Sequence, residues 1–221
     1  MKKVVLPIIS LLLILTFGNI NAQTNISIGA RAGLNIASLS FDPDIAGGVN
    51  KSSRTGFKFG GALEVGFAPM FALQIEPMYS QGGCVLDNVS FGFTNGKVTF
   101  KVSYIEIPIL FKVKIPVQGS VTPYAFVGPN LGLVLSANQL SEGGGQSQET
   151  DIKDQTTSMV FALDFGAGAG IKVAPLTTVI LDVRYSLGLS SVLNDKGKQV
   201  SGFNSVKSNG FQVVAGVMFG L

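Results

Sequence analysis

The sequence contains no histidine, no tryptophan and a single cysteine, Cys84, among its 221 residues. Without an imidazole side chain, the protein cannot build a Ser-His-Asp triad or a histidine-ligated zinc site. One cysteine cannot close an internal disulfide, so Cys84 is expected to be a plain small residue near a loop, with a disulfide to another chain as the alternative. We therefore predict no catalytic residue, no metal ligand and no cofactor.

Charged residues are also scarce, at 13% of the chain, and the formal net charge is only +3. Proteins that bind nucleic acids carry a concentrated positive charge that attracts phosphate groups. The sequence therefore predicts no nucleic-acid partner.

Long apolar runs are missing everywhere except at the N-terminus, so a bundle of membrane-spanning helices is excluded, since each helix needs about 20 apolar residues. Lys2 and Lys3 precede an apolar stretch over residues 4–15, and the small residue Ala22 stands just before Gln23. This order is typical of a cleaved Sec-type signal peptide, here residues 1–22, which leaves residues 23–221 as one domain. The alternative is an uncleaved membrane anchor.

The rest of the chain alternates between apolar and polar or small residues with a period of two, which is the pattern of β-strands. In residues 26–36, for example, the even positions are apolar and the odd positions include Gly29, Arg31 and Asn35. The segments that alternate in this way are 26–36, 56–67, 71–80, 98–113, 123–136, 159–173, 178–189 and 211–221. In 98–113 the apolar positions change phase at Tyr104, which predicts a β-bulge.

The connections between these segments are of two kinds. Short turns lie at 68–70, 116–123 and 174–176, and long polar loops lie at 38–55, 81–97, 138–157 and 190–208. Short turns on one rim and long loops on the other are typical of outer membrane barrels, whose short turns are periplasmic. We predict an all-β fold, an eight-stranded antiparallel up-and-down transmembrane β-barrel, with both mature termini in the periplasm and the long loops outside the cell.

The two faces of the strands differ in a way that favours a membrane over water. The non-apolar face carries mostly glycine, alanine and serine rather than dense charge, so we expect it to line a narrow lumen. Its isolated charges nearly balance and predict an ionic network in that lumen: Arg31, Lys58, Glu64, Glu76, Glu106, Lys112, Asp164, Lys172, Asp182 and Arg184. The alternatives are a selectivity ring in a narrow pore for these charges, and a water-soluble eight-stranded barrel for the fold.

Aromatic residues near the strand ends are expected to form girdles at the two membrane interfaces. They are Phe57, Phe67, Phe71, Tyr79, Tyr124, Tyr185, Phe211 and Phe219.

Three motifs give the chain a family resemblance. They are the segment 104–108 (YIEIP) with Phe111 and Lys112, the segment 123–132 (PYAFVGPNLG), and the segment 181–189 (LDVRYSLGL). Together they resemble the PorT-like family of outer membrane β-barrel proteins over nearly the whole mature chain. The resemblance implies an eight-stranded barrel in the outer membrane of a Gram-negative cell, in a family whose named member is linked to protein secretion and gliding.

These observations predict a non-enzymatic integral outer membrane protein with a structural or binding role, or a role in an envelope complex, exerted through its long loops. The alternative is a narrow channel for small solutes. The expected partners are outer-membrane lipid, an unidentified molecule bound by the loops, and the barrel-assembly machinery, because Phe219 on the last strand resembles the terminal signal of its clients.

Overall fold

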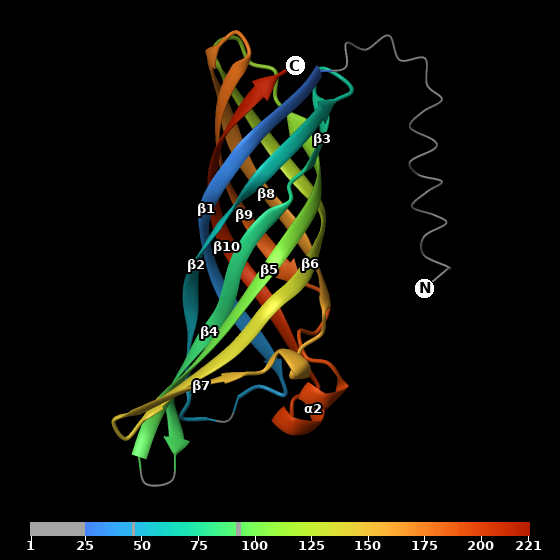
Figure 1. Ribbon diagram of the computed structural model, residues 1–221. Coiled ribbons are helices and arrows are strands. Elements are labelled where there is room, and N and C mark those ends of the chain that lie inside the picture. Colours follow the sequence, from blue (N-terminus) through green and yellow to red (C-terminus); the bar gives the residue numbers. More distant parts are fainter. Residues whose placement is uncertain (1–24, 46, 92–93) are drawn as a thin grey trace, which may run out of the picture.

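The computed structural model describes residues 25–221 except residues 46, 92 and 93. The predicted signal peptide lies outside the described residues. The elements are β1 (Asn25–Asp42), β2 (Asn50–Gly66), β3 (Phe71–Ile75), β4 (Met78–Phe91), β5 (Thr94–Lys114), β6 (Val121–Gly143), β7 (Gln146–Asp151), the 3-10 helix η1 (Lys153–Gln155), β8 (Met159–Ala174), β9 (Thr177–Gly188), α2 (Asp195–Ser201) and β10 (Ser205–Gly220). Figure 1 shows their arrangement around one axis.

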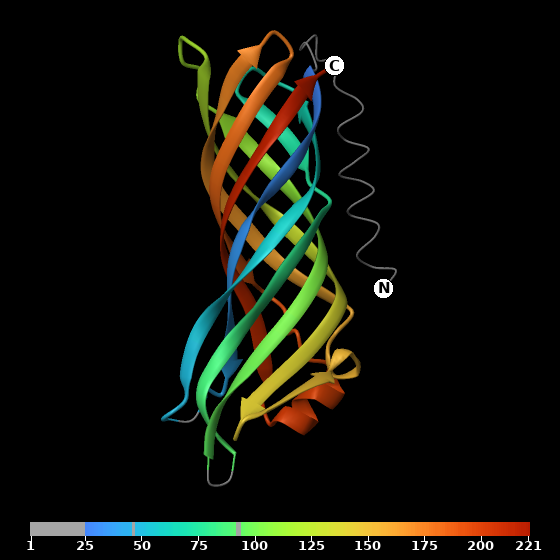
Figure 2. The same ribbon diagram turned by 60° about the vertical axis from the view of Figure 1, so that its left-hand side comes forward.

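The strands form one antiparallel sheet that closes on itself, because β1 pairs with β10, for example Ser27 with Gly220. β3 and β4 are two parts of one barrel strand, interrupted at Glu76 and Pro77, and both pair with β2 and with β5. β7 follows β6 in a hairpin and pairs only with the last part of β6, so it is not part of the ring. The ten strands therefore make an eight-stranded ring, which confirms the predicted architecture (Figure 2).

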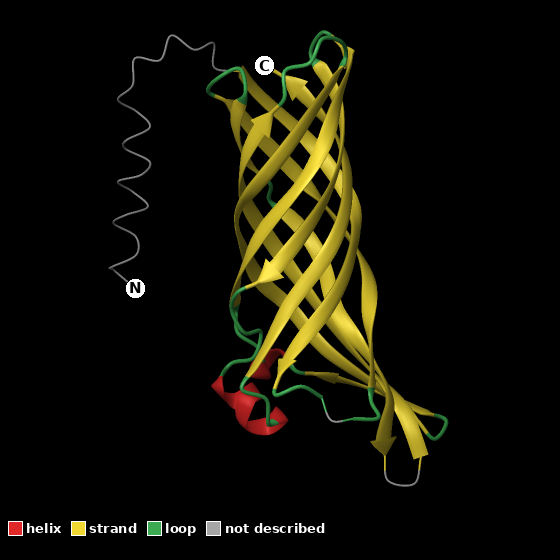
Figure 3. Cartoon of the chain, turned by 180° about the vertical axis from the view of Figure 1, so that it is seen from behind, coloured by secondary structure: helices red, strands yellow, loops and turns green. Residues whose placement is uncertain are grey.

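The short turns and the long connections lie at opposite ends of the barrel. β1 begins and β10 ends at the rim that carries the turns after β2, β5 and β8, whereas α2 and β7 lie at the other rim (Figures 1 and 3). We call these the turn rim and the loop rim. No helix among the described residues is long and apolar enough to cross a membrane.

Apolar side chains point outward and polar ones inward over the middle of the barrel. On β9 the exposure alternates strictly, with Leu181 55% exposed and Asp182 2% exposed. On β1 the exposed apolar residues run from Ile26 to Ile36, a height of about 25 Å for a strand that rises ~3.3 Å per residue at a tilt of ~40°. This apolar belt has the height of the hydrophobic band of outer membrane barrels.

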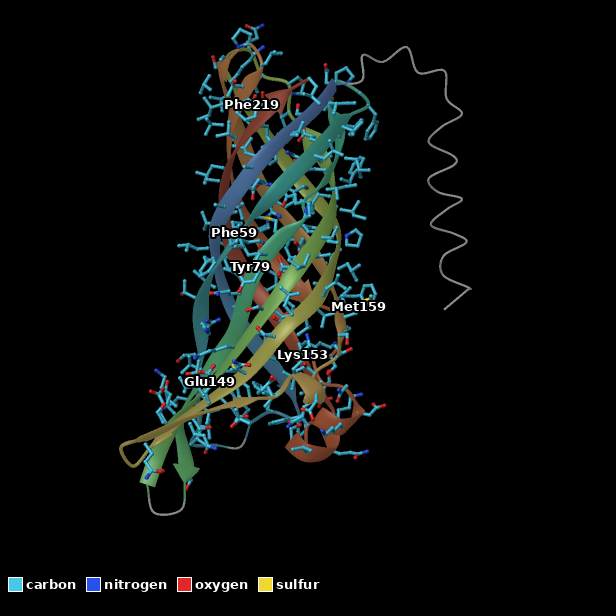
Figure 4. All side chains as sticks on the ribbon, viewed as in Figure 1. Phe59, Tyr79, Glu149, Lys153, Met159 and Phe219 are labelled. Carbon is cyan, nitrogen blue, oxygen red and sulfur yellow. The ribbon has the colours of Figure 1, made fainter. Side chains whose placement is uncertain are left out.

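Labelled side chains in Figure 4 mark the belt and what lies beyond it. Phe59, Tyr79 and Met159 project outward from the wall, Phe219 lies near the turn rim, and Glu149 and Lys153 lie toward the loop rim.

Beyond the belt, the strands continue through much of the regions predicted as long loops. β1 reaches Asp42, β4 and β5 stay paired as far as Phe91 and Thr94, and β6 and β7 form a hairpin. The described residues that lie outside strands in these connections are 43–45, 47–49, 144–145, 152–158 and 189–204, and they include η1 and α2. The predicted loops 38–55, 81–97 and 138–157 are therefore largely strand, which corrects the expected boundaries.

The cause of this difference is a change in what fills the barrel. Toward the loop rim the inward side chains become apolar and form a plug: Leu39, Phe41, Cys84, Leu86, Val98 and Val206, with Ile45, Val49, Leu193 and Phe203 packed against them. In the belt, apolar residues face outward and polar residues inward, whereas toward the loop rim apolar residues face inward and polar residues outward. The polar outward residues of this part are of the kinds common in loops, so the strands were predicted as loops.

The same change explains the phase shift predicted in residues 98–113. The even positions of β5 face inward without interruption, from Val98 and Val102 in the apolar part to Glu106 and Lys112 in the polar part. A register irregularity does exist opposite Tyr104, but the extra residue is Leu135 on β6. A bulge within β5 was therefore the wrong explanation of its pattern.

Candidate functional site: the barrel lumen

Two aromatic rings narrow the lumen in the turn-side half of the barrel. Tyr124 and Phe126 on β6 pair directly with Gly168 and Gly166 on β8. A Cβ atom at Gly168 would lie 2.8 Å from Cζ of Tyr124, and one at Gly166 would lie 2.8 Å from Cζ of Phe126. The two rings thus lie over glycines, an arrangement that covers bare backbone in barrels.

Tyr124 was predicted to belong to an interfacial girdle, and this is wrong, because its side chain is buried in the lumen. The other girdle candidates point outward or lie at a rim. Phe67, Phe71 and Phe111 stack at the turn rim, with the rings of Phe71 and Phe111 5.7 Å apart. Phe57 and Tyr79 form a second outer group with Phe59.

The central cluster of the lumen consists of two arginines and two carboxylates. Nη1 of Arg184 lies 2.7 Å from Oε2 of Glu76, and its Nη2 lies 3.0 Å from Oδ1 of Asp182. Arg31 donates to the same two carboxylates. Since these residues come from β1, β9 and the break between β3 and β4, they tie together parts of the wall that are not neighbours.

The break at Glu76 has a local cause. Pro77 has no N–H to donate, and the Glu76 backbone N–H instead donates to Pro108 O at 3.1 Å. Glu76 is fully buried, and isolated buried charge would cost several kcal/mol. Its contacts with both arginines and with Gln74 supply the required compensation.

A second group lies toward the turn rim, around Glu64 on β2. Nζ of Lys112 lies 2.7 Å from Oε2 of Glu64 and 3.9 Å from the centroid of the Tyr124 ring. Lys114 donates to the other carboxylate oxygen of Glu64. Lys114 was not among the predicted lumen charges, although it shares its strand face with Lys112.

Lys172, in contrast, was predicted in the network but is exposed and forms no salt bridge within the part of the chain that the structure describes. It lies two residues before the end of β8, where the turn rim opens to solvent and a lysine side chain can reach water. The lysine that joins Lys112 in the lumen network is therefore Lys114 and not Lys172.

A third group lies toward the loop rim. Nζ of Lys58 donates to Oε2 of Glu106 at 2.8 Å and to Oε1 of Gln212 at 2.6 Å. Asp164, buried nearby, accepts hydrogen bonds from Asn130 and Ser186. Asp164 forms no salt bridge with a described residue, although it was predicted as a member of an ion-paired network.

Polar and apolar side chains together block the lumen at two levels. The central cluster is buried, with Arg184 and Glu76 at most 1% exposed. The apolar plug closes the lumen between this cluster and the loop rim. The cavities of the interior include a vestibule of about 170 Å³ around Lys112 and Lys114 and a chamber of about 40 Å³ beside Glu106.

Among the described residues, no three His, Cys, Asp or Glu side chains lie close enough to form a metal site. Cys84 is a free thiol buried in the plug.

The loop rim carries a sheet that protrudes from the barrel. β2, β4, β5, β6 and β7 remain paired there, while the first and last strands pair separately with each other (Figure 1). All six residues of β7 are exposed. Hydrogen bonding by Asn138 and the charge of Lys101 hold the pKa of Glu149 on this sheet below its usual range.

Comparisons with known proteins agree with this architecture. The family model of the outer membrane protein beta-barrel domain matches residues 21–194. No curated protein sequence matches the chain.

Among solved structures, OprG of Pseudomonas aeruginosa aligns with a TM-score of 0.52 and 12% identity, covering 90% of this chain and 96% of OprG. Neisserial surface protein A aligns with a TM-score of 0.46 and 17% identity, covering 87% of this chain and 96% of that protein. At such identities the OprG alignment bears on the fold alone. With the family match over most of the sequence, the chain belongs to the family of the outer membrane protein beta-barrel domain and is an outer membrane protein.

Proposed function

We propose that this protein is a non-enzymatic outer membrane barrel that binds a partner outside the cell through the sheet at its loop rim. The observation that carries the proposal is the two-level block of the lumen by the buried Arg31, Glu76, Asp182 and Arg184 cluster and by the apolar plug. Because the interior serves to hold the wall together, the surface left for recognition is the protruding sheet.

The protruding sheet has the properties of a recognition surface. β7 is paired along one edge and presents only polar residues, with the sequence QSQETD. A strand with an open edge can pair with a strand of another molecule, while polar side chains protect it against self-association.

The orientation is part of the same proposal. Short turns face the periplasm in outer membrane barrels, so the turn rim and both mature termini would be periplasmic after removal of residues 1–22. The apolar belt would contact lipid, and the barrel-assembly machinery would insert the chain. The resemblance of residues 104–112, 123–132 and 181–189 to PorT-like proteins supports a role in an envelope complex, including one linked to secretion.

Capture from intact envelopes tests the binding role. The wild-type protein is compared with a variant in which residues 144–151 are replaced by a two-residue turn, and with Leu176→Ser at the turn rim as the control. We expect a defined envelope component to be retained by the wild type and the control and lost from the hairpin variant. Equal capture by all three proteins would contradict a role for the protruding sheet.

A narrow channel is the second candidate, and the vestibule of about 170 Å³ lined by Lys112, Lys114 and Glu64 is the observation that favours it. Conductance across planar bilayers separates the two functions. We expect no sustained steps from the purified barrel. Ion-selective steps that disappear in Lys112→Gln would establish the channel and overturn the blocked lumen.

A further inference from the structure

A small chamber lies inside the wall on the loop side of the central cluster. Its volume is about 40 Å³, and polar groups of six residues line it beside the apolar Val160, Phe161, Ala162 and Val192: Tyr104, Glu106, Asn130, Ser186, Ser190 and Ser208. It is situated where β8 begins and β9 ends. None of these side chains is part of the central cluster.

Hydrogen bonding to Asp164 fixes which atoms face this chamber. Nδ2 of Asn130 donates to Oδ2 of Asp164 at 3.1 Å, and Oγ of Ser186 donates to Oδ1 at 2.6 Å. An ionised carboxylate can only accept hydrogen bonds, so Asn130 and Ser186 must each donate one to Asp164. Asn130 keeps one N–H and the lone pairs of its Oδ1, and Ser186 keeps the lone pairs of its Oγ.

The amide oxygen of Asn130 is left without a partner. Asn130 is 3% exposed, and its Oδ1 has no hydrogen-bond partner within the described part of the chain. The hydroxyl oxygen of Tyr104, on the neighbouring strand β5, also has no hydrogen-bond partner among the described residues. Unpaired buried oxygens are costly, and here two of them line one cavity.

The charge around the chamber does not balance. Glu106 and Asp164 are both buried, and the cation that contacts either of them is Lys58, through Oε2 of Glu106. The nearby central cluster is neutral by itself, with Arg31 and Arg184 against Glu76 and Asp182. Between this group and the central cluster, one negative charge is therefore left over beside the chamber, and the surplus positive charge of Lys112 and Lys114 over Glu64 lies toward the turn rim.

We propose that this chamber binds one small monovalent cation, with Na⁺ as its probe. Carboxylate, amide and hydroxyl oxygens are the ligands of hard cations, and a single positive charge neutralises the excess. At roughly 10–15 Å³ for each water-sized sphere, the chamber has room for such an ion with one or two waters. The ion would tie β5 and β6 to β8 and β9 at the level where β9 ends.

Unfolding by urea in lipid vesicles tests the proposal, with NaCl replaced by choline chloride at constant ionic strength, since choline is too large for the chamber. Above the dissociation constant, each tenfold rise in Na⁺ should raise the folded-to-unfolded ratio about tenfold. The ²³Na resonance should also broaden on addition of the barrel. A midpoint that is equal in Na⁺ and choline, with an unbroadened resonance, would overturn the proposal and leave a proton as the neutralising charge.

Asp164→Asn is the informative variant, because it removes the excess charge while keeping the shape of the side chain. It should lose the dependence on Na⁺ and the ²³Na broadening, whereas Glu149→Gln on the exposed strand β7 should keep both. If Asp164→Asn fails to fold, Ser186→Ala provides the second variant and should weaken Na⁺ binding at least tenfold. Unchanged Na⁺ dependence in whichever of these variants folds would refute the chamber as the site.

Discussion

The glycines under the lumen aromatics show how single residues set the interior of this barrel. At Gly168 an added Cβ would lie 2.5 Å from Cβ of Asp182 and 2.6 Å from O of Leu181. Eight strands leave space for side chains from only some positions. A glycine here allows the ring of Tyr124 to lie over the wall and contact Lys112 and Asp182.

Gly168→Ala should therefore destabilise the barrel by about 1–3 kcal/mol, the usual cost of forcing extra atoms into a packed interior. The matched control is Gly61→Ala on the outer face, where the nearest atom to an added Cβ is 3.7 Å away. Alanine at that position should leave the free energy of unfolding unchanged or raise it slightly. Urea unfolding of both variants in vesicles makes the comparison, and equal effects would contradict the packing of Tyr124 on Gly168.

Leu181 and Asp182 are neighbours on β9 that face opposite surroundings. Leu181→Arg should cost about 2–4 kcal/mol in a bilayer near its midplane, because it places a charge in hydrocarbon. Leu181→Ala controls for lost bulk. The penalty should shrink in detergent micelles, where the arginine can reach water. A harmless Leu181→Arg in bilayers would mean that the belt does not face lipid.

Asp182→Asn should behave differently because its site is inside the protein. Asp182 accepts from Arg31, Arg184 and Tyr124. Breaking a buried ion pair by removing one partner costs about 3–5 kcal/mol. This loss should be the same in micelles and in bilayers, as measured by urea unfolding in each. A loss confined to bilayers would contradict the placement of Asp182 in the lumen.

At the scale of the strand, the sequence predicts the part of the fold where the two faces differ in polarity. The alternation in 159–173 and 178–189 is regular because apolar residues face outward over the whole height of β8 and β9. It fails in 123–136, since the inward positions of β6 hold Tyr124 and Phe126 beside Gly128, Asn130 and Gly132. Inward aromatic residues hide the period of two.

The lumen network shows the same limit for a site. The alternation of their strands predicts an inward position near a strand end for both Lys114 and Lys172, and nothing in the local sequence distinguishes them. Glu64 decides between them, because β2 is separated from β5 only by β3 and this places Glu64 within reach of Lys114. The stagger of strands around the barrel sets this contact, and one sequence does not contain that information.

The opposite rims provide a prediction about exposure of individual elements. In a Cys84→Ala background, a cysteine at Ser147 on the β6–β7 hairpin should react with a membrane-impermeant maleimide on whole cells. A cysteine at Leu176 in the turn after β8 should react only after the envelope is opened. The unmodified protein should not react under either condition, because Cys84 is fully buried. Labelling at Leu176 on intact cells would reverse the proposed orientation.

For the whole molecule, stability has two separate contributions, one from the contacts of the filled interior and one from the contact of the apolar belt with lipid. The interior groups are already enclosed by protein, with Lys58 and Arg184 at 1% exposure, so their contacts should depend little on the surrounding lipid. The belt, in contrast, gains stability only from the hydrocarbon that covers it. The thickness of that hydrocarbon should therefore act on the belt alone.

Bilayer thickness should consequently change the stability of the barrel in a predictable direction. A belt of about 25 Å, estimated from strand rise and tilt, should give the highest free energy of unfolding in short-chain phosphatidylcholine vesicles of similar hydrocarbon thickness. Each additional ångström of hydrocarbon should lower it by a fraction of a kcal/mol. Urea unfolding across a series of chain lengths measures this slope, with Asp182→Asn as the control, because it should lower every value while leaving the slope unchanged. A barrel that is indifferent to chain length and folds in plain buffer would be water-soluble, since only then would its outer face have no preference for lipid.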